Sequence, residues 1–381
     1  MAWMQNQLYV KKKNTLMVLD LIAGAQSISR TQLSDITELS PASITRIVGA
    51  LIALNLVHEE GTVDQLSRGR KARILRVCKD GLYALGICLD QDRVSLSLTD
   101  LTQQCLYRSF IPLGRDEPRT PQVFSAYAKK LYAGMNRDLI HDWSRLRIVG
   151  VSVPGVVDST RGVVLKSDQM NWTEADLRTP FEDAFGLPVW IENDAKACLT
   201  GERVRMSIPR QEDTAYLMVG TGVGVAVMSN GKLIRGHRNM AGEIEHLNLV
   251  PGLLPEDVLQ AHLVEDEIIK NAQAASPSVH SLEDLMIAYR QNVGFARILV
   301  GDVMQYLRLA LSMIDSFYDP QRIILGGSTV QKLKEALGSL FRDSRISLGE
   351  DYEQSCMLGA SIEAIRHALD ALIGDQENAK S

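Results

Sequence analysis

The clearest pattern of hydrophobic and polar positions lies between Ser29 and Gly61, SRTQLSDITELSPASITRIVGALIALNLVHEEG. It predicts two short helices separated by a tight turn. The second helix is expected to start with Ser40 as its cap and Pro41 at its first position. Its apolar residues recur at steps of three and four, the spacing of one buried helical face: Ile44, Ile47, Val48, Leu51 and Leu54.

The opposite face of this helix carries only small or hydrogen-bonding residues and one guanidinium: Ala42, Ser43, Thr45, Arg46 and Gly49. A helix that enters a DNA major groove needs such a slim face with a few groups able to read bases. We therefore predict a recognition helix in which Ser43, Thr45 and Arg46 contact DNA. An ordinary helical hairpin is the alternative that this pattern alone leaves open.

Two short β-rich runs follow at residues 62–77, TVDQLSRGRKARILRV, around a Gly-Arg-Lys tip. Glycine lets a backbone approach DNA closely, and arginine favours the negative potential of a narrow minor groove. The runs predict a β-wing whose Arg68, Arg70 and Lys71 contact DNA. With helices expected to begin at the capping residues Asn14 and Ser29, residues 1–80 are predicted to form a winged helix-turn-helix domain.

The charge distribution supports a nucleic-acid-binding arm. Residues 1–80 carry 11 Lys and Arg against 7 Asp and Glu, a net charge of +4, whereas the remaining 301 residues carry 30 against 39, a net charge of −9. A weakly acidic protein has thus placed its positive charge at one end.

The composition indicates an ordinary soluble protein of two or three domains, with 381 residues of which 45% are hydrophobic. No apolar run approaches the roughly 20 residues of a membrane span, and no signal-peptide core precedes Lys11–Lys13. The five cysteines are scattered without a CxxC pair, which is typical of reduced thiols in a cytoplasmic protein. We expect no membrane association.

From about residue 81 the sequence pattern becomes that of β-strands. YALGICLD, RVSLSLTD and QCLYRSFI predict a three-stranded meander, and a helix is expected over about 121–139. RLRIVGVSVPG and LPVWIEND then read as buried parallel strands, the second of which ends in Glu192, Asn193 and Asp194. Ligands bind at the carboxyl ends of strands in α/β sheets, so these three residues are candidates for a binding site.

The second half repeats this scheme with two strands around a Gly-rich turn, a helical region over about 255–317, a strand ending in Gly326-Gly327, and a closing helix over 354–373. Two such halves predict two lobes facing a cleft. The expected lobes are 81–195 together with the C-terminal helix, and 196–350.

At this point five blocks resemble the ROK family (repressors, open reading frames, kinases), in its Mlc/NagC-type repressor branch. They are GVSVPGVVD (150–158), LPVWIENDAKACLTGE (187–202), VGTGVGVAVMSNGKLIRG (219–236), AGEIEH (241–246) and IILGGS (323–328). With the N-terminal winged helix, the likeness covers nearly the whole chain. It implies an α/β fold: a winged helix-turn-helix followed by a two-lobed, actin-like/RNase H-like domain of the sugar-kinase type, residues 81–381.

The resemblance also implies site residues. By the family's pattern, Asn193 binds sugar hydroxyls, Asp194 is the vestigial general base, and Glu243 and His246 contact further hydroxyls. Asn171 and Glu265 match sugar-side positions more loosely. The alternative for Asn193 and Asp194 is that they merely end a strand, and a second cluster in a matching block argues against it.

One departure from the family concerns phosphate. The kinases have an Asp-x-Gly-Gly-Thr turn after the first strand, where this chain has Cys88, Asp90 and Gln91. Phosphate binding needs approachable backbone N–H groups and little negative charge, so Asp90 and Asp92 oppose it. We expect no kinase activity and no cofactor.

A second departure concerns zinc. Many relatives bind it with a cysteine cluster after the histidine, but LNLVPGLLPEDVLQAHLVEDE, residues 247–267, contains no cysteine. His246 and His262 alone are a poor zinc set, so we expect no bound metal.

The sequence therefore predicts a sugar-responsive transcriptional repressor of carbohydrate uptake or metabolism. Its expected partners are operator DNA, a carbohydrate effector and further copies of itself in a homodimer or homotetramer. Two alternatives stay open: an ATP-dependent hexose kinase with a DNA-binding arm, and a repressor controlled by a partner protein such as a sugar-transport component.

Overall fold

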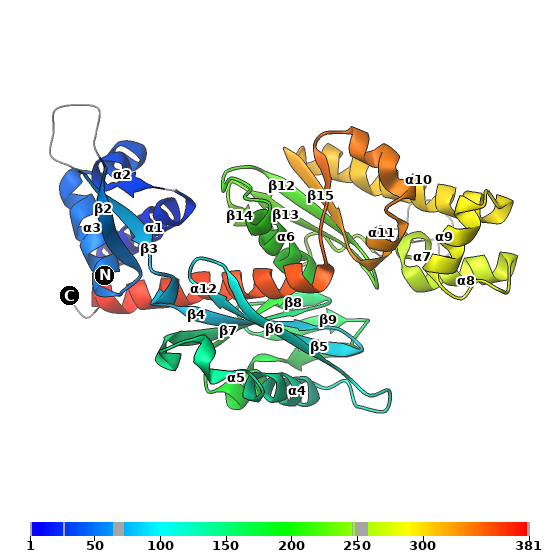
Figure 1. The fold of residues 1–381 in the computed structure, drawn as a ribbon, viewed down its shortest axis with the longest axis horizontal. Helices are drawn as coiled ribbons and strands as arrows, with labels where there is room; N and C mark the ends of the chain where they lie inside the picture. The colour runs from blue at the N-terminus through cyan, green and yellow to red at the C-terminus, as the bar shows by residue number, and fades with distance from the viewer. Residues whose placement is uncertain (1, 26, 64–71, 246, 248–257, 379–381) are drawn as a thin grey trace.

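The computed structural model describes residues 2–25, 27–63, 72–245, 247 and 258–378 (Figure 1). An N-terminal arm lies at one end of the chain's fold and two α/β lobes make up the rest. The long C-terminal helix α12 (Tyr352–Asn378) runs from the lobes to the arm.

The arm consists of three helices and a three-stranded sheet of order β1-β3-β2: α1 (Ala2–Gly24), β1 (Ile28–Ser29), α2 (Arg30–Thr37), α3 (Pro41–Ala53), β2 (Val57–Val63) and β3 (Ala72–Val77). Ser29 caps α2 in a capping box with Gln32, and Ser40 caps α3 by accepting from the Ser43 N–H. This is the winged helix-turn-helix predicted from the sequence. The wing tip, residues 64–71 with Arg68, Arg70 and Lys71, lies outside the described residues.

The prediction that the first helix begins at Asn14 is wrong. Helix α1 already starts at Ala2, so Asn14 lies inside it. Residues 1–13 contain no glycine or proline that would end a helix. An asparagine inside such a helix-compatible segment lowers helix stability too little to interrupt it.

The first lobe is built on a five-stranded sheet of order β11-β7-β4-β5-β6, in which β4, β7 and β11 are parallel and β4, β5 and β6 form the predicted meander. Helices α4 and α5 cover one face and α12 covers the other (Figure 1). A small sheet of order β10-β9-β8 adjoins it. The bounds are β4 (Tyr83–Leu89), β5 (Arg93–Asp100), β6 (Cys105–Pro112), α4 (Pro121–Ala133), β7 (Leu146–Val153), β8 (Val156–Asp158), β9 (Val163–Ser167), β10 (Trp172–Asp176), α5 (Arg178–Phe185) and β11 (Val189–Asn193).

Helix α12 lies unusually close to the strands it covers. A Cβ added at Gly86 would stand 2.1 Å from the Met357 carbonyl oxygen, and one at Gly150 would stand 2.0 Å from that of Ala360. Only glycine permits this approach, which fixes the height of the helix above the sheet.

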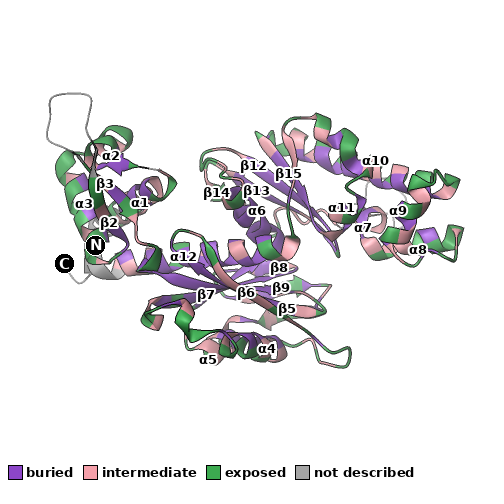
Figure 2. Ribbon diagram, viewed as in Figure 1, coloured by how far each residue is buried: buried purple, intermediate pink, exposed green. Residues whose placement is uncertain are grey.

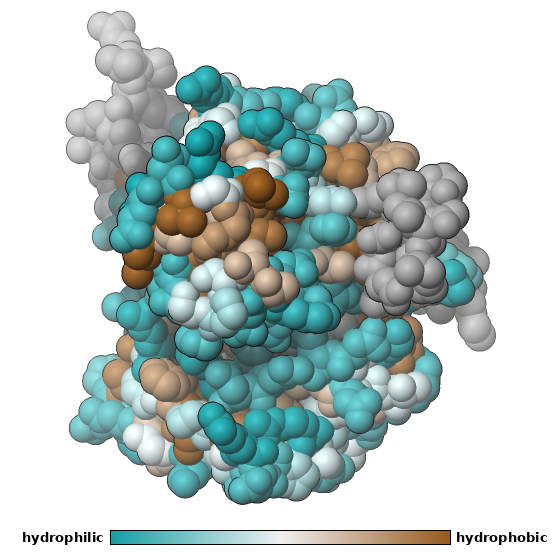
Figure 3. All heavy atoms as spheres, turned by 90° about the vertical axis from the view of Figure 1, so that its right-hand side faces the viewer, coloured by the Kyte–Doolittle hydropathy of each residue, from teal (hydrophilic) through white to brown (hydrophobic). Residues whose placement is uncertain are grey.

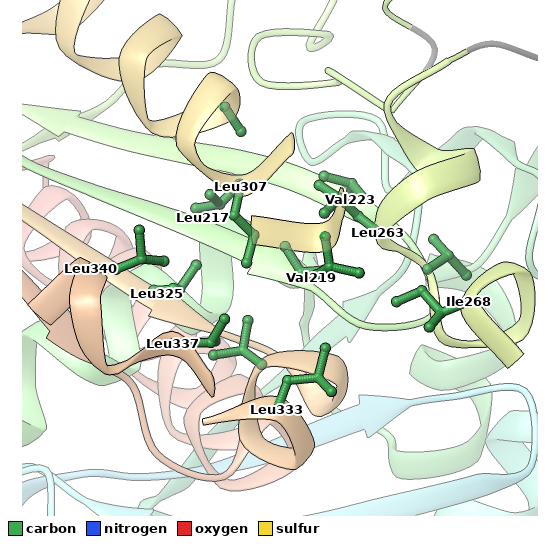
Figure 4. Close-up of a cluster of buried hydrophobic side chains, with 14 of the residues drawn as sticks. Leu217, Val219, Val223, Leu263, Ile268, Leu307, Leu325, Leu333, Leu337 and Leu340 are labelled. Carbon is green, nitrogen blue, oxygen red and sulfur yellow. The ribbon is translucent and has the colours of Figure 1, made fainter. Parts of the chain in front are cut away.

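The second lobe has a five-stranded sheet of order β14-β13-β12-β15-β16, with α6 on one face and α7 to α11 on the side of the other. Its largest core lies between the strands and α7 to α11, and Leu217, Leu307 and Leu337 belong to this buried cluster (Figure 4). The bounds are α6 (Asp194–Arg205), β12 (Thr214–Val219), β13 (Val223–Ser229), β14 (Lys232–Leu233), α7 (Gln260–Leu263), α8 (Glu265–Ala275), α9 (Leu282–Arg290), α10 (Gly294–Tyr318), β15 (Arg322–Gly326), α11 (Ser328–Leu333) and β16 (Ile346–Leu348). Short 3-10 helices lie at Lys79–Gly81, Arg137–Leu139, Trp143–Arg145 and Ala336–Arg342.

The arm shares its hydrophobic core with the first lobe. Leu19 and Ile22 of α1 belong to the same buried cluster as Ile365 and Leu369 of α12 and Ile148 of β7 (Figure 2). This shared cluster joins residues on both sides of residue 80, so the structure marks no break in apolar packing there. The domain boundaries drawn from the sequence remain predictions.

Within the described residues no single helix has both the length and the apolar character to span a membrane. The pair α2 and α3, bent by 119°, passes that criterion by length and composition only.

Candidate functional site

A polar pocket of about 300 Å³ lies between the two lobes. The first lobe contributes the carboxyl ends of its strands and the β8–β10 sheet, and the second lobe contributes the β12–β13 turn and the start of α8. Figure 3 views the molecule from the side of α8 and α9, and hydrophilic residues are prominent where the lobes face each other. Polar side chains in its lining include Gln91, Asp168, Gln169, Asn193, Asp194, Glu243, Glu245, Asp266 and Glu267.

Asn193 and Asp194 lie where β11 passes into α6. Asn193 is the N-cap of α6 and accepts from the Lys196 N–H at 3.0 Å. Its side-chain amide donates to the Gly155 carbonyl oxygen at 2.9 Å and to Asp194 Oδ1 at 3.0 Å. Asn193 therefore has a structural role at the end of a strand, as the alternative interpretation expected. Asn193 and Asp194 nevertheless both line the pocket.

Asp194 is held by three donors although only 3% of it is exposed. Its Oδ1 accepts from the Ala195 N–H at 2.8 Å and from Asn193, and its Oδ2 accepts from the Tyr352 hydroxyl at 3.1 Å. Burial raises the pKa of Asp194 to about 7, and the nearby carboxylates of Glu243 and Asp90 push the pKa in the same direction. The group thus sits close to its titration midpoint at neutral pH.

The structure brings together three of the six candidate sugar-binding residues, since Asn193, Asp194 and Glu243 line one pocket. His246 lies outside the described residues. Asn171 is exposed in the turn between β9 and β10 with φ 54°, and Glu265 begins α8 and pairs with Lys332 Nζ at 2.6 Å. Neither of these two is among the pocket-lining residues.

Sequence reasoning missed the acidic character of this pocket. Its lining includes six carboxyl groups and no lysine or arginine, as far as the described residues go: Asp168, Asp194, Glu243, Glu245, Asp266 and Glu267. The sequence did contain a signal, because no Lys or Arg occurs between Arg238 and Lys270. One lining carboxylate has a cationic partner, since Lys166 Nζ lies 3.0 Å from Asp168 Oδ2. Two further positive groups contact residues outside the lining: Arg235 pairs with Glu192 at 2.6 Å, and Lys196 Nζ donates to the Asn239 carbonyl oxygen at 3.3 Å.

The turn between β4 and β5 occupies the place expected for phosphate binding. Asp90 is largely enclosed there, and its burial raises its pKa. Gln91, in the same turn, donates its side-chain amide to the Gln169 carbonyl oxygen. A second pocket of about 310 Å³ beside this turn is lined by Asp90, Asp351 and Glu353 along with Arg93 and Lys332.

The Gly326-Gly327 pair has a structural reason to be glycine. Gly327 has φ +101°, and a Cβ there would stand 2.2 Å from the Val219 carbonyl oxygen. Close backbone packing therefore accounts for the glycine without any phosphate.

The predicted recognition face of α3 points to solvent. Thr45 and Arg46 are exposed and Ser43 is half-buried, whereas Ile44, Ile47 and Val48 face the core. Other arginines of the arm form ion pairs within it, since Arg30 and Arg73 share Glu59 and Arg76 pairs with Glu60. Within the described part of the arm, no ion pair is recorded for Arg46.

No group of three or more His, Cys, Asp or Glu side chains suited to hold a metal ion is found in the part of the chain that the structure describes.

The fold combines a winged helix-turn-helix with two α/β lobes that have a polar pocket between them. Residues 85–344 match the ROK family, and the chain belongs to that family. The resemblance found in the sequence blocks is thereby confirmed.

Among related proteins, the xylose repressor of Bacillus spizizenii is 28% identical over 386 residues, which cover 96% of this chain and 98% of the repressor. The DNA-binding transcriptional dual regulator NagC of Escherichia coli K12 is 24% identical over 357 residues, covering 87% of this chain and 84% of NagC.

Solved structures show the same fold. A ROK family transcriptional regulator described as a homologue of the E. coli MLC protein superposes with a TM-score of 0.78 at 22% identity, covering 98% of this chain and all of that one. The ROK hexokinase of Thermus thermophilus reaches 0.63 at 22% identity over 76% of this chain and all of the kinase. The predicted α/β fold class is thus confirmed.

Proposed function

We propose that this protein is a DNA-binding transcriptional repressor of genes for carbohydrate uptake or metabolism, controlled by a sugar in the cleft between its lobes. The observation that carries the proposal is the combination of an exposed recognition face on α3 with a kinase-like cleft containing Asn193, Asp194 and Glu243. The repressor names of the full-length relatives support it.

On DNA, Ser43, Thr45 and Arg46 contact base edges in the major groove, and Arg68, Arg70 and Lys71 of the wing contact the minor groove or phosphates. The protein acts as a homodimer or homotetramer, because paired arms then match two half-sites of a two-fold symmetric operator.

In the cleft, Asn193, Asp194 and Glu243 bind sugar hydroxyls, and His246, Asn171 and Glu265 are further candidates from the family pattern. Carboxylate and amide groups at strand ends suit vicinal hydroxyls, which both donate and accept hydrogen bonds. The acidic lining disfavours a phosphorylated sugar, whose charge at neutral pH is about −1.5 to −2. D-Xylose is the first ligand to test, since relatives are named for it.

The protein does not act as a kinase in this proposal. Phosphoryl transfer depends on neutralising the charge of the phosphates, and the site offers Asp90 and Gln91 where kinases have glycines. The kinase alternative predicts sugar-dependent ATP turnover.

The test measures binding of the full chain to its selected operator fragment while unphosphorylated pentoses and hexoses are added, D-xylose first. We expect at least one of these sugars to change operator affinity at least fivefold, within the usual range of allosteric coupling. ATP turnover with the same sugars is measured in parallel. Turnover at ordinary kinase rates, about 1–100 s⁻¹, would refute the non-enzyme part.

A partner protein is the remaining alternative. It requires that no purified sugar shifts operator binding while a fractionated cell extract does.

A further inference from the structure

Helix α12 begins inside the cleft region. Its first residue, Tyr352, donates its hydroxyl to Asp194 Oδ2 at 3.1 Å, and one turn later the Cys356 thiol contacts the Asp194 carbonyl oxygen at 3.5 Å. Asp194 lines the pocket between the lobes, whereas Tyr352 lines the second pocket beside the β4–β5 turn. The hydrogen bond between Tyr352 and Asp194 therefore joins a residue of one pocket to a residue of the other.

The other end of α12 lies in the arm. Ile365 and Leu369 are buried in one cluster with Leu19 and Ile22 of α1, and Asp370 pairs with Lys12 Nζ at 2.6 Å. Tyr352 and Asp370 are separated by about 27 Å along the helix axis at 1.5 Å per residue. Figure 1 shows this single helix reaching from the lobes to the arm.

Helix α12 is also packed tightly against α6, the helix that starts at Asp194. A Cβ at Gly359 would stand 1.7 Å from the Ala197 carbonyl oxygen, and one at Gly201 would stand 2.1 Å from that of Ser355. Backbones in such contact do not deform gradually, so a displacement at the start of α12 is passed along the helix as a rigid shift.

The hydrogen bonds of Asp194 make Tyr352 a competitor of the ligand. Oδ1 already accepts from Ala195 and Asn193, so Oδ2 is the oxygen better placed to accept from a sugar hydroxyl. Among the described residues the recorded donor to Oδ2 is Tyr352. A sugar that takes this oxygen weakens or replaces the bond that holds the first turn of α12.

We propose that Tyr352 is the positioning residue that couples the cleft to the DNA-binding arm. With the cleft empty, its hydroxyl binds Asp194 and sets the position of α12. A sugar hydroxyl displaces it, α12 shifts, and α1 moves with the helix because the two share a core. This inference rests on the proposed sugar-controlled DNA binding.

The test compares the full-length wild type with Tyr352→Phe, which removes the hydroxyl and keeps the ring. Sugar affinity is measured by calorimetry and operator affinity by fluorescence anisotropy, with D-xylose first and then other unphosphorylated pentoses and hexoses. In the wild type the sugar changes operator affinity at least fivefold. In Tyr352→Phe the sugar binds as tightly or more tightly, but operator affinity changes less than twofold.

Tyr127→Phe is the matched control, because Tyr127 also donates to a carboxylate, Glu117 Oε1 at 3.0 Å, but belongs to α4. It should keep the wild-type coupling. Full coupling in Tyr352→Phe overturns the inference, and so does a parallel loss of sugar affinity and coupling, which would make Tyr352 an ordinary ligand contact. A wild type that binds operator but responds to no sugar overturns the sugar control itself, which is a different failure.

Discussion

Replacing Asp194 with asparagine tests the electrostatics of the cleft. Asparagine keeps the shape of the side chain and can still accept from the Ala195 N–H, but it cannot ionise. In the wild type the pKa rises from 3.8 in the unfolded chain to about 7 in the folded protein, chiefly through burial. Ionising this group therefore costs the native state more than the unfolded state.

The magnitude follows from this difference in pKa. About three pKa units at 1.36 kcal/mol each give roughly 4 kcal/mol as the full native-state cost of ionisation. Because the folded form binds more protons between the two pKa values, this contribution makes the wild type less stable as pH rises from about 4 to above 7. Between pH 5 and pH 8 this contribution lowers the free energy of unfolding of the wild type by about 2–3 kcal/mol. Asp194→Asn should show no such decrease, because asparagine does not ionise.

The assay is urea unfolding of wild type and variant at pH 5 and pH 8. We expect the stability of Asp194→Asn relative to wild type to be about 2–3 kcal/mol greater at pH 8 than at pH 5, while its response to sugar falls and its operator affinity is kept. Asp116→Asn, an exposed carboxylate in a loop, is the control and should show no such change. An equal relative stability of Asp194→Asn at both pH values would show that folding does not raise the pKa of Asp194.

Three further changes have defined outcomes. Arg46→Ala should weaken operator binding by about 1–3 kcal/mol and relax specificity at one base pair, and unchanged binding across a set of single-base variants of the operator would mean that α3 is misassigned. Gly327→Ala should lower the free energy of unfolding by about 1–3 kcal/mol or more, because the positive φ and the Val219 carbonyl oxygen 2.2 Å from the new Cβ both oppose a side chain. Gly338→Ala, which has open space around the new Cβ, is the control in the same unfolding assay. A sugar phosphate should bind at least about tenfold more weakly than its parent sugar in calorimetry, since like charges in a partly enclosed site repel strongly, and equal affinities would show that the acidic lining does not face the ligand.

Local sequence patterns predicted the arm well because its signals are local. The caps at Ser29 and Ser40 and the apolar spacing from Ile44 to Leu51 each act within a few residues. The predicted start of α1 at Asn14 is wrong because that prediction also used only a local signal. A capping residue such as Asn14 is only a weak signal when the preceding residues are themselves compatible with a helix.

The candidate site was predicted only where a strand end or a family block marked it. Asn193, Asp194 and Glu243 were found in this way, but Tyr352 was not. Tyr352 lies 158 positions from Asp194 in the sequence, and although the last helix was expected in the first lobe, no local pattern predicts that Tyr352 contacts Asp194. The acidity of the pocket was equally hidden, because Asp168 and Glu267 come from different lobes and meet only in the folded chain.

We propose above all that this protein reads a specific DNA sequence through α3. The most direct measurement is to recover and sequence the genomic fragments that bind the purified full-length protein, beside Arg46→Ala as the comparison. The full chain is needed because the arm shares its core with α12. We predict that the wild type enriches a two-fold symmetric motif next to carbohydrate genes and that Arg46→Ala loses or relaxes it. Equal enrichment by both proteins, or no motif with either, would contradict sequence-specific DNA binding through α3.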